Sequence, residues 1–306
     1  MNTKPPLKQE LPSPYNLDLC GVLGDLNRTT RIGRANLAND PVTAAFLAAG
    51  MRLVQRALGP GAERTPRDLD DLSSLQRPLL AFLSQRAVAK EVGNNPDPFP
   101  RQGTVAALRD RWKSQSHYIA DLLRFCMWSQ HLPAYPLTLS DESKGHLDEL
   151  INGPNSVPSI HRISYDDIDF LLNHPRFRLK LVAAAAAEGD SVIRSAMAEC
   201  YQGLQEEWEA VCAKVLQRRG LQLRPDVTIH DFVRLLIAMG EGVGVSALAD
   251  PGAKIFDASQ KCCLLGTGVL ALIRGSIERT EDADGKTLEQ AVSEMMDLIQ
   301  SEANDG

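Results

Sequence analysis

The fold is decided by a stretch whose centre reads Gly220-Leu-Gln-Leu-Arg-Pro-Asp-Val-Thr228, within residues Asp190 to Pro251. Before this loop, apolar residues recur every three or four positions from Val192 to Leu216, which predicts a long helix with one buried face. Gly220 ends that helix, because glycine adopts left-handed backbone geometry without strain. Thr228-Ile-His-Asp231 is a capping box that starts a second helix. The stretch therefore predicts two helices joined by a short loop.

These residues resemble a known family. The long helix, the loop GLQLRPDVT (220–228) and a helix that runs into EGVGVSALADP (241–251) are similar to the C-terminal ligand-binding domain of TetR-type transcriptional regulators. The resemblance covers roughly residues 175–300. It implies an all-α bundle that binds a ligand and dimerises. On their own, the residues also fit an ordinary helical hairpin in another all-α protein.

The composition of the 306 residues is typical of a globular protein, with 43% hydrophobic and 24% charged residues. No apolar run approaches about 18 residues, and Met1 to Tyr15 lack a charged start followed by an apolar block. We therefore expect neither a membrane span nor a signal peptide. The six cysteines form no C-x-x-C pair, which favours reduced thiols and no zinc site. These features predict a cytoplasmic protein without a metal site.

Catalytic motifs are not recognisable in the sequence. It has no G-x-G-x-x-G after a strand, no P-loop lysine and no H-E-x-x-H, and its six histidines are scattered. We expect neither a catalytic site nor a cofactor.

Charge is divided unevenly along the chain, whose net charge is −6. Residues 1–131 contain 17 Lys and Arg against 12 Asp and Glu, and residues 132–306 contain 16 against 27. A basic first part joined to an acidic remainder is typical of a nucleic-acid-binding region attached to an acidic body.

Two short helices in the basic part have the spacing of a helix-turn-helix. Thr104 caps Val105–Trp112, a polar turn follows at Lys113–Ser116, and a second helix is predicted from His117 to Phe125. In such a unit the first helix braces the second, whose N-terminal end enters the major groove of DNA. The residues predicted to contact double-stranded operator DNA are Thr104, Arg111, Lys113, Ser114, Gln115, Ser116, His117 and Tyr118.

This segment is similar to the DNA-recognition unit of TetR-type regulators. The family-like positions are Thr104, Leu108, Ile119 and Phe125. The segment departs from the family pattern at Arg109, where alanine is usual, and at Lys113, where glycine usually makes the turn. It also begins far from the start of the chain. The alternative interpretation is a plain helical hairpin.

The resemblance further implies a pocket for a small apolar effector, lined from helices that start near residues 175, 191 and 229. The candidate lining residues are Phe177, Leu181, Met197, Tyr201, Trp208, Phe232 and Met239. The same residues fit a plain core, because every amphipathic helix needs such a stripe.

The last two predicted helices are Ala253–Ser276 and a helix capped by Thr287. By the same resemblance they imply the interface of a homodimer, at about residues 253–300, in which each copy contributes two helices. Gly266 and Gly268 would let two helices approach closely. Alternatively, these helices close the core of their own domain.

Breakers and caps divide the remaining chain. Residues 1–17 are expected to form a mobile tail, and a helix is predicted at Pro41–Leu58. A helix that starts at Thr65-Pro66 is expected to be divided by Pro78. After a connector that begins at Pro133, Ser164-Tyr-Asp-Asp167 is a second capping box and predicts a helix start.

The sequence thus predicts an all-α multi-helix bundle in three parts. These are a partly disordered N-terminal arm at 1–40, a helical region with the candidate helix-turn-helix at 41–131, and a ligand-binding and dimerisation bundle at 132–306. The first hypothesis is a TetR-like, ligand-responsive transcriptional regulator that binds operator DNA as a homodimer. The second is a helical small-molecule- or protein-binding scaffold that has lost DNA reading.

Overall fold

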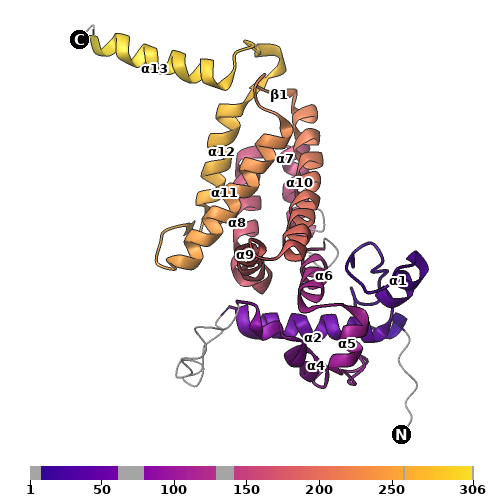
Figure 1. The fold of residues 1–306 in the computed structure, drawn as a ribbon. Helices are drawn as coiled ribbons and strands as arrows, with labels where there is room; N and C mark the ends of the chain where they lie inside the picture. Colours follow the sequence, from indigo (N-terminus) through magenta and orange to yellow (C-terminus); the bar gives the residue numbers. More distant parts are fainter. Residues whose placement is uncertain (1–7, 61–78, 129–140, 258, 305–306) are drawn as a thin grey trace. The chain divides into compact units, whose positions relative to one another are not determined.

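The computed structural model describes residues 8–60, 79–128, 141–257 and 259–304. It confirms the all-α class, with 12 α-helices and two small two-stranded sheets among the described residues (Figure 1). Three predicted features lie outside those residues: the first seven residues of the tail, the helix that starts at Thr65-Pro66, and the start of the connector at Pro133.

The chain divides into two compact units. The first unit contains residues Met1–Pro133 and Asn173–Gln202, and the second contains Ala134–Leu172 and Gly203–Gly306. This division differs from the predicted boundary at residue 131, because residues 173–202 pack with the N-terminal helices.

The first unit is built around one long helix. Its helices are η1 (Lys8–Glu10), α1 (Arg31–Ala38), α2 (Pro41–Leu58), η3 (Ala81–Leu83), α4 (Gln85–Val92), α5 (Val105–Arg111), α6 (Gln115–Met127), α9 (Pro175–Ala187) and the first part of α10 (Ser191–Arg219). Helix α2 begins and ends as predicted, and the side chain of Asp40 caps it by accepting a hydrogen bond from the Val42 amide. It packs against α4, α6 and α9. A Cβ atom at Gly50 would overlap the hydroxyl of Tyr118, so glycine permits the close approach of α2 and α6.

The segment of residues 8–26 belongs to the core of the first unit. Leu11 and Leu19 are buried, and the ring of Tyr15 lies 5.0 Å from that of Phe99 and 5.1 Å from that of Phe125. The expectation of a mobile tail therefore does not hold for residues 8–17. Their apolar side chains enter the core one at a time, without the helical period on which the expectation relied.

The second unit contains the predicted helix pair and both small sheets. Its elements are α7 (Asp141–Asn152), α8 (Ser156–Asn173), the second part of α10, β1 (Leu221–Leu223), α11 (Ile229–Ala249), β2 (Phe256–Asp257), β3 (Cys262–Cys263), α12 (Leu264–Ser276), β4 (Ile277–Arg279), η5 (Thr280–Asp282) and α13 (Leu288–Asn304). Gly220 has φ +61°, as the predicted end of α10 requires. Thr228 accepts a hydrogen bond from the Asp231 amide, so the predicted start of α11 is confirmed.

Two local predictions in the second unit are wrong. The capping box at Ser164–Asp167 lies inside α8, which has already begun at Ser156. Residues 253–276 are not one helix, because β2 and β3 pair antiparallel before α12 begins at Leu264. In the first case a short polar motif predicted a helix start that the structure does not have. In the second the sequence showed no break before the true helix start at Leu264.

Helices α11 and α12 pack against each other and against α8. A Cβ atom at Gly266 would lie 2.5 Å from His161 Nδ1 on α8, and one at Gly240 would lie 3.6 Å from Asp167 Oδ2. At the other end of the helices, β1 and β4 pair antiparallel, with Gln222 opposite Glu278. One side of the α11–α12 pair is therefore fixed against the interior of its own unit.

Candidate functional site

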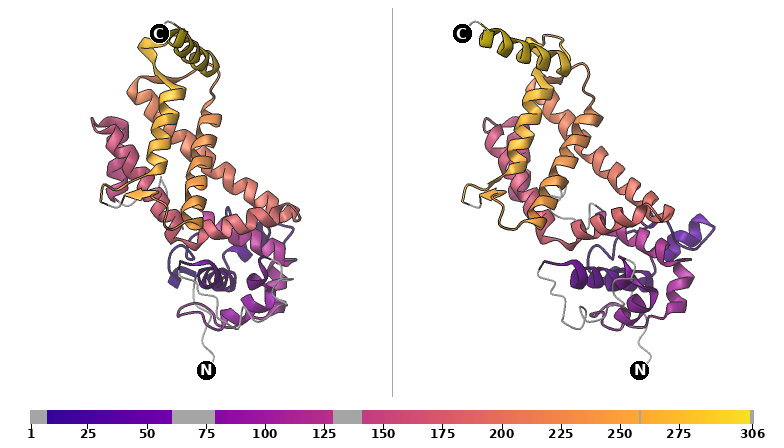
Figure 2. Two further views of the ribbon diagram at one scale, coloured as in Figure 1. Left: turned by 90° about the vertical axis from the view of Figure 1, so that its left-hand side faces the viewer. Right: turned by 60° about the vertical axis from the view of Figure 1, so that its left-hand side comes forward.

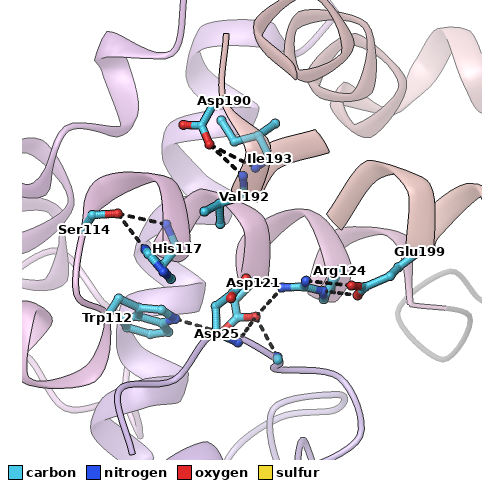
Figure 3. A network of polar contacts seen from close by, with 11 residues as sticks. Asp25, Trp112, Ser114, His117, Asp121, Arg124, Asp190, Val192, Ile193 and Glu199 are labelled. Carbon is cyan, nitrogen blue, oxygen red and sulfur yellow. Dashed lines mark hydrogen bonds and ion pairs between the residues drawn. The ribbon is translucent and has the colours of Figure 1, made fainter. Parts of the chain in front are cut away.

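The candidate helix-turn-helix forms two helices, of which the first begins as predicted and the second begins at Gln115, two residues before the predicted start at His117. The Thr104 hydroxyl accepts a hydrogen bond from the Ala107 amide at 3.0 Å and starts α5. The Ser114 hydroxyl caps α6, where it accepts from the His117 amide and lies 2.7 Å from His117 Nδ1 (Figure 3). The turn is therefore shorter than predicted, because Ser114 caps α6 and places Gln115 and Ser116 in its first turn.

The second of these helices is covered on most of its surface. Eight of the 13 residues of α6 are buried, and it packs on α2 and α9, whereas α5 packs on α4. A helix that reads the major groove must present one side to DNA. Helix α6 instead occupies the interior of the first unit.

Two predicted DNA contacts, Arg111 and Tyr118, are core residues. Tyr118 is fully buried and donates a hydrogen bond from its hydroxyl to the Phe46 carbonyl at 2.9 Å. Arg111 is 7% exposed, forms an ion pair with Asp40 at 2.7 Å and donates to the Thr43 hydroxyl at 3.1 Å. Both polar groups have partners inside the protein in this conformation, and a contact of these two residues with DNA stays a prediction.

Most of the remaining predicted contacts also have internal partners. The Ser116 hydroxyl donates to Asp190, whose other carboxylate oxygen accepts from the amides of Val192 and Ile193 and caps α10. Burial raises the pKa of Asp190, but the hydrogen bonds from Ser116 and from those amides outweigh it and leave the pKa lowered. Gln115 is half-buried beside the Leu80 carbonyl. Of the predicted set, Thr104 and Lys113 are exposed.

A buried polar network, which the sequence did not predict, holds this region together (Figure 3). Asp121 on α6 is fully buried and accepts from Trp112 Nε1 at 2.9 Å, from the Gly24 amide at 2.8 Å and from the Asp25 amide at 3.0 Å. Arg124 lies 2.9 Å from Asp121 and 2.6 Å from Asp25. Burial raises the pKa of Asp121 to about 6, although these donors and the charge of Arg124 lower it.

The network explains why α6 cannot be separated from its surroundings. Asp121 ties α6 to the end of α5 and to residues 24–25, and Arg124 ties α6 to Glu199 on α10 at 2.6 Å. A buried carboxylate with several donors is costly to disrupt, since each donor left without a partner loses its hydrogen bond without gaining water. These contacts serve the fold of the first unit.

The predicted effector-binding residues are divided between the two units. Phe177, Leu181, Met197 and Tyr201 belong to the first unit, and Trp208, Phe232 and Met239 belong to the second. In the first unit Met197 is part of the main core, Tyr201 packs against that core, and Lys180 Nζ lies 4.6 Å from the centre of the Tyr201 ring. In the second, Met239 contacts α12 at Gly268. The effector pocket stays a prediction from the resemblance.

An exposed apolar surface lies on α11 and α12, on the sides of these helices that point away from α8. We call it the outer face, defined by Leu235, Ala238, Gly242 and Val245 on α11 and by Leu264, Thr267 and Ala271 on α12, all of which are exposed. Gly266 and Gly268 do not belong to it, because they face His161 and Met239 within the same unit. Their close approach therefore serves the unit's own packing.

The apolar character of α11 extends around most of its circumference. By length and composition α11 could cross a membrane, although the sequence predicts no membrane span, but core helices of soluble proteins meet the same criterion. Phe232, Val233, Gly240 and Gly244 are buried, and the outer face is not. The spacing of the exposed residues along both helices, every three or four positions, could have indicated a second apolar side in the sequence.

Comparison of the chain with family models, with curated proteins and with solved structures found no match. The resemblance to TetR-type regulators therefore stays a prediction, and the function is argued from the geometry of the two sites.

Proposed function

We propose that this chain is a helical protein-binding scaffold that does not read DNA through residues 104–118, and that its outer face binds a second copy of the chain. The observation that carries the proposal is the exposed apolar surface of α11 and α12. Leu235, Val245 and Leu264 are 52%, 42% and 54% exposed. Helices of a soluble protein normally turn such residues towards a core, and an exposed row of them is typical of a protein interface.

The shape of the outer face suits another helix. Between its large residues lie Ala238, Gly242 and Ala271, where the side chain is small or absent. Side chains of a partner helix can pack over such positions at interaxial distances of about 8–10 Å. Partners that bring large apolar side chains are therefore favoured over polar ligands.

A protein partner also fits α11 better than a lipid bilayer does. A single span exposes its whole circumference to lipid, but Gly240 packs beside Asp167 and Phe232 is buried within the unit. Asp231 and Arg234 are exposed near the start of the helix. These features support an amphipathic arrangement with two apolar sides, one for the unit's own core and one for a partner.

The proposal excludes the candidate helix-turn-helix as a DNA reader. Arg111, Ser116 and Tyr118 support this, because each already has a partner within the first unit. We expect selection of bound duplexes from a random DNA pool to enrich no palindrome at low or moderate salt. Enrichment of a palindrome that is lost in a Lys113→Ala/His117→Ala double variant would contradict the scaffold and favour the regulator.

Sedimentation equilibrium of the full chain tests the protein-binding function. We expect a species of twice 33.5 kDa and, for Leu235→Asp/Val245→Asp, a dissociation constant at least about 100-fold larger, because two charges would enter an apolar interface. The control is Ile32→Asp/Leu79→Asp, which changes two exposed apolar residues outside the outer face. A monomer at every concentration, or equal effects of the two double variants, would contradict the proposed function.

A further inference from the structure

Helix α13, at the end of the described chain, has an apolar side that no described residue of its unit covers. Val292, Met295 and Met296 are 46%, 55% and 53% exposed, and their spacing places them on one side of the helix. Figures 1 and 2 show α13 leading away from α11 and α12 beyond the end of α12. The outer face and the apolar side of α13 are therefore both exposed in a single copy of the chain.

The start of α13 is fixed, which sets the direction in which the helix leaves the unit. The Thr287 hydroxyl accepts from the Gln290 amide, and the Gln290 side chain accepts from the Thr287 amide, as in a capping box. The Leu288 amide also donates to Asp226 Oδ1 at 2.8 Å, and Arg224 Nη1 donates to the Lys286 carbonyl. These bonds anchor α13 to the loop that follows β1.

The apolar side of α13 carries large side chains, and the middle of the outer face carries small residues. Two methionines and a valine project from α13, whereas Ala238 and Gly242 make the middle of α11 shallow. The 17 residues of α13 extend about 25 Å, and the 13 residues of α12 extend about 20 Å. Methionine side chains also adapt well to irregular apolar surfaces.

The charges of the two surfaces are complementary as well. Residues 288–304 contain four acidic and no basic residues. Arg234 and Arg274 are exposed at one end of the outer face together with one acidic residue, Asp231, and neither arginine forms an ion pair with any residue in the described ranges. Glu289 is exposed beside the apolar side of α13. An acidic helix would thus meet two free guanidinium groups at the edge of an apolar surface.

We propose that α13 of one copy packs along the outer face of a second copy, and that the second copy returns its α13 to the first. The inference rests on the proposed function and names the segment that occupies the outer face. One chain carries both halves of the contact, so a symmetric pair of copies satisfies both, and no apolar helix is left exposed.

Photo-crosslinking in the full chain tests which segment occupies the outer face. Met295 is replaced by p-benzoylphenylalanine, and equal amounts of unlabelled and ¹⁵N-labelled protein are mixed, equilibrated and irradiated. We expect mixed-isotope crosslinks that join α13 peptides to peptides from 229–249 or 264–276. Crosslinks within one copy, or between two α13 helices, would overturn the proposal even if the protein is dimeric. A protein that stays monomeric overturns both this proposal and the proposed function.

A matched pair of variants provides a second readout. We expect Met295→Asp to weaken dimerisation at least about 10-fold, because it places a charge in the apolar contact, and Ser293→Asp to leave it within about twofold. Both residues are exposed in a single copy, so neither change should prevent folding. If Met295→Asp dimerises like Ser293→Asp while Leu235→Asp/Val245→Asp does not, the outer face binds another segment and the exchange of α13 is wrong.

Discussion

Helices α6 and α11 differ in a way that composition does not suggest. Helix α6 carries His117, Asp121 and Arg124, yet eight of its 13 residues are buried. Helix α11 is apolar enough to suggest a membrane span, yet only four of its 21 residues are buried. The burial of a helix therefore depends on the segments that pack around it and not on its composition alone. Neighbouring segments supply partners for the polar groups of α6, whereas the described residues of its unit leave one apolar side of α11 exposed.

The largest expected effect comes from truncating the same residue type in each helix. Leu122 on α6 is fully buried, so Leu122→Ala should lower the free energy of unfolding of the first unit by about 3–4 kcal/mol. Leu235 on α11 is 52% exposed, so Leu235→Ala should change the stability of a monomer by less than about 0.5 kcal/mol. Hydrogen exchange of the α6 and α11 peptides at increasing urea measures both. Equal losses of stability in the two variants would contradict the difference in burial between α6 and α11.

A smaller loss of stability is expected when the buried carboxylate of Asp121 on α6 is removed. Asp121→Ala leaves Trp112 Nε1 and two backbone amides without their acceptor, which should cost about 2–3 kcal/mol at neutral pH. Urea denaturation of the variant and of Asp110→Asn provides the comparison, since Asp110 forms only an exposed pair with Arg28. If the two variants are equally stable, the network does not hold the first unit together.

The smallest expected effect is a pH dependence. The pKa of Asp121 is raised to about 6 by burial, from an ordinary value of 3.8. Between these values the folded state binds more protons than the unfolded state, so the contribution of this group is present below pH 3.8 and lost as pH rises through 6. Relative to Asp121→Asn, the natural chain should lose about 1 kcal/mol of stability per pH unit between pH 4 and 6. A difference that is flat or rises with pH would contradict this assignment.

Local patterns in the sequence predicted much of the fold. Periodic apolar residues and breakers predicted α2 and α10, and the capping box at Thr228 predicted the start of α11. These features succeed because a cap or an apolar stripe acts over a few neighbouring residues. The role of Gly50 could not be predicted from local patterns, because it depends on contact with Tyr118, which is distant in the sequence.

The candidate site was less predictable. Thr104 and Ser114 cap their helices as a helix-turn-helix requires, but capping does not show which side of a helix is free. The sequence carried no signal of this further burial, because the apolar stripe of Tyr118, Ile119, Leu122, Phe125 and Cys126 is no wider than that of a helix with one exposed side. The buried Asp121 gave no signal either, because its donors come from segments far apart in the chain.

Hydrogen exchange of the full chain, measured at low and at high protein concentration, tests the central claim most directly. The account predicts that the peptides of α11 and α12 exchange more slowly at high concentration, where a second copy covers the outer face, and that the peptides of α6 exchange equally at both concentrations. Exchange of α11 and α12 that is independent of concentration would contradict it. So would protection that appears in α6 instead.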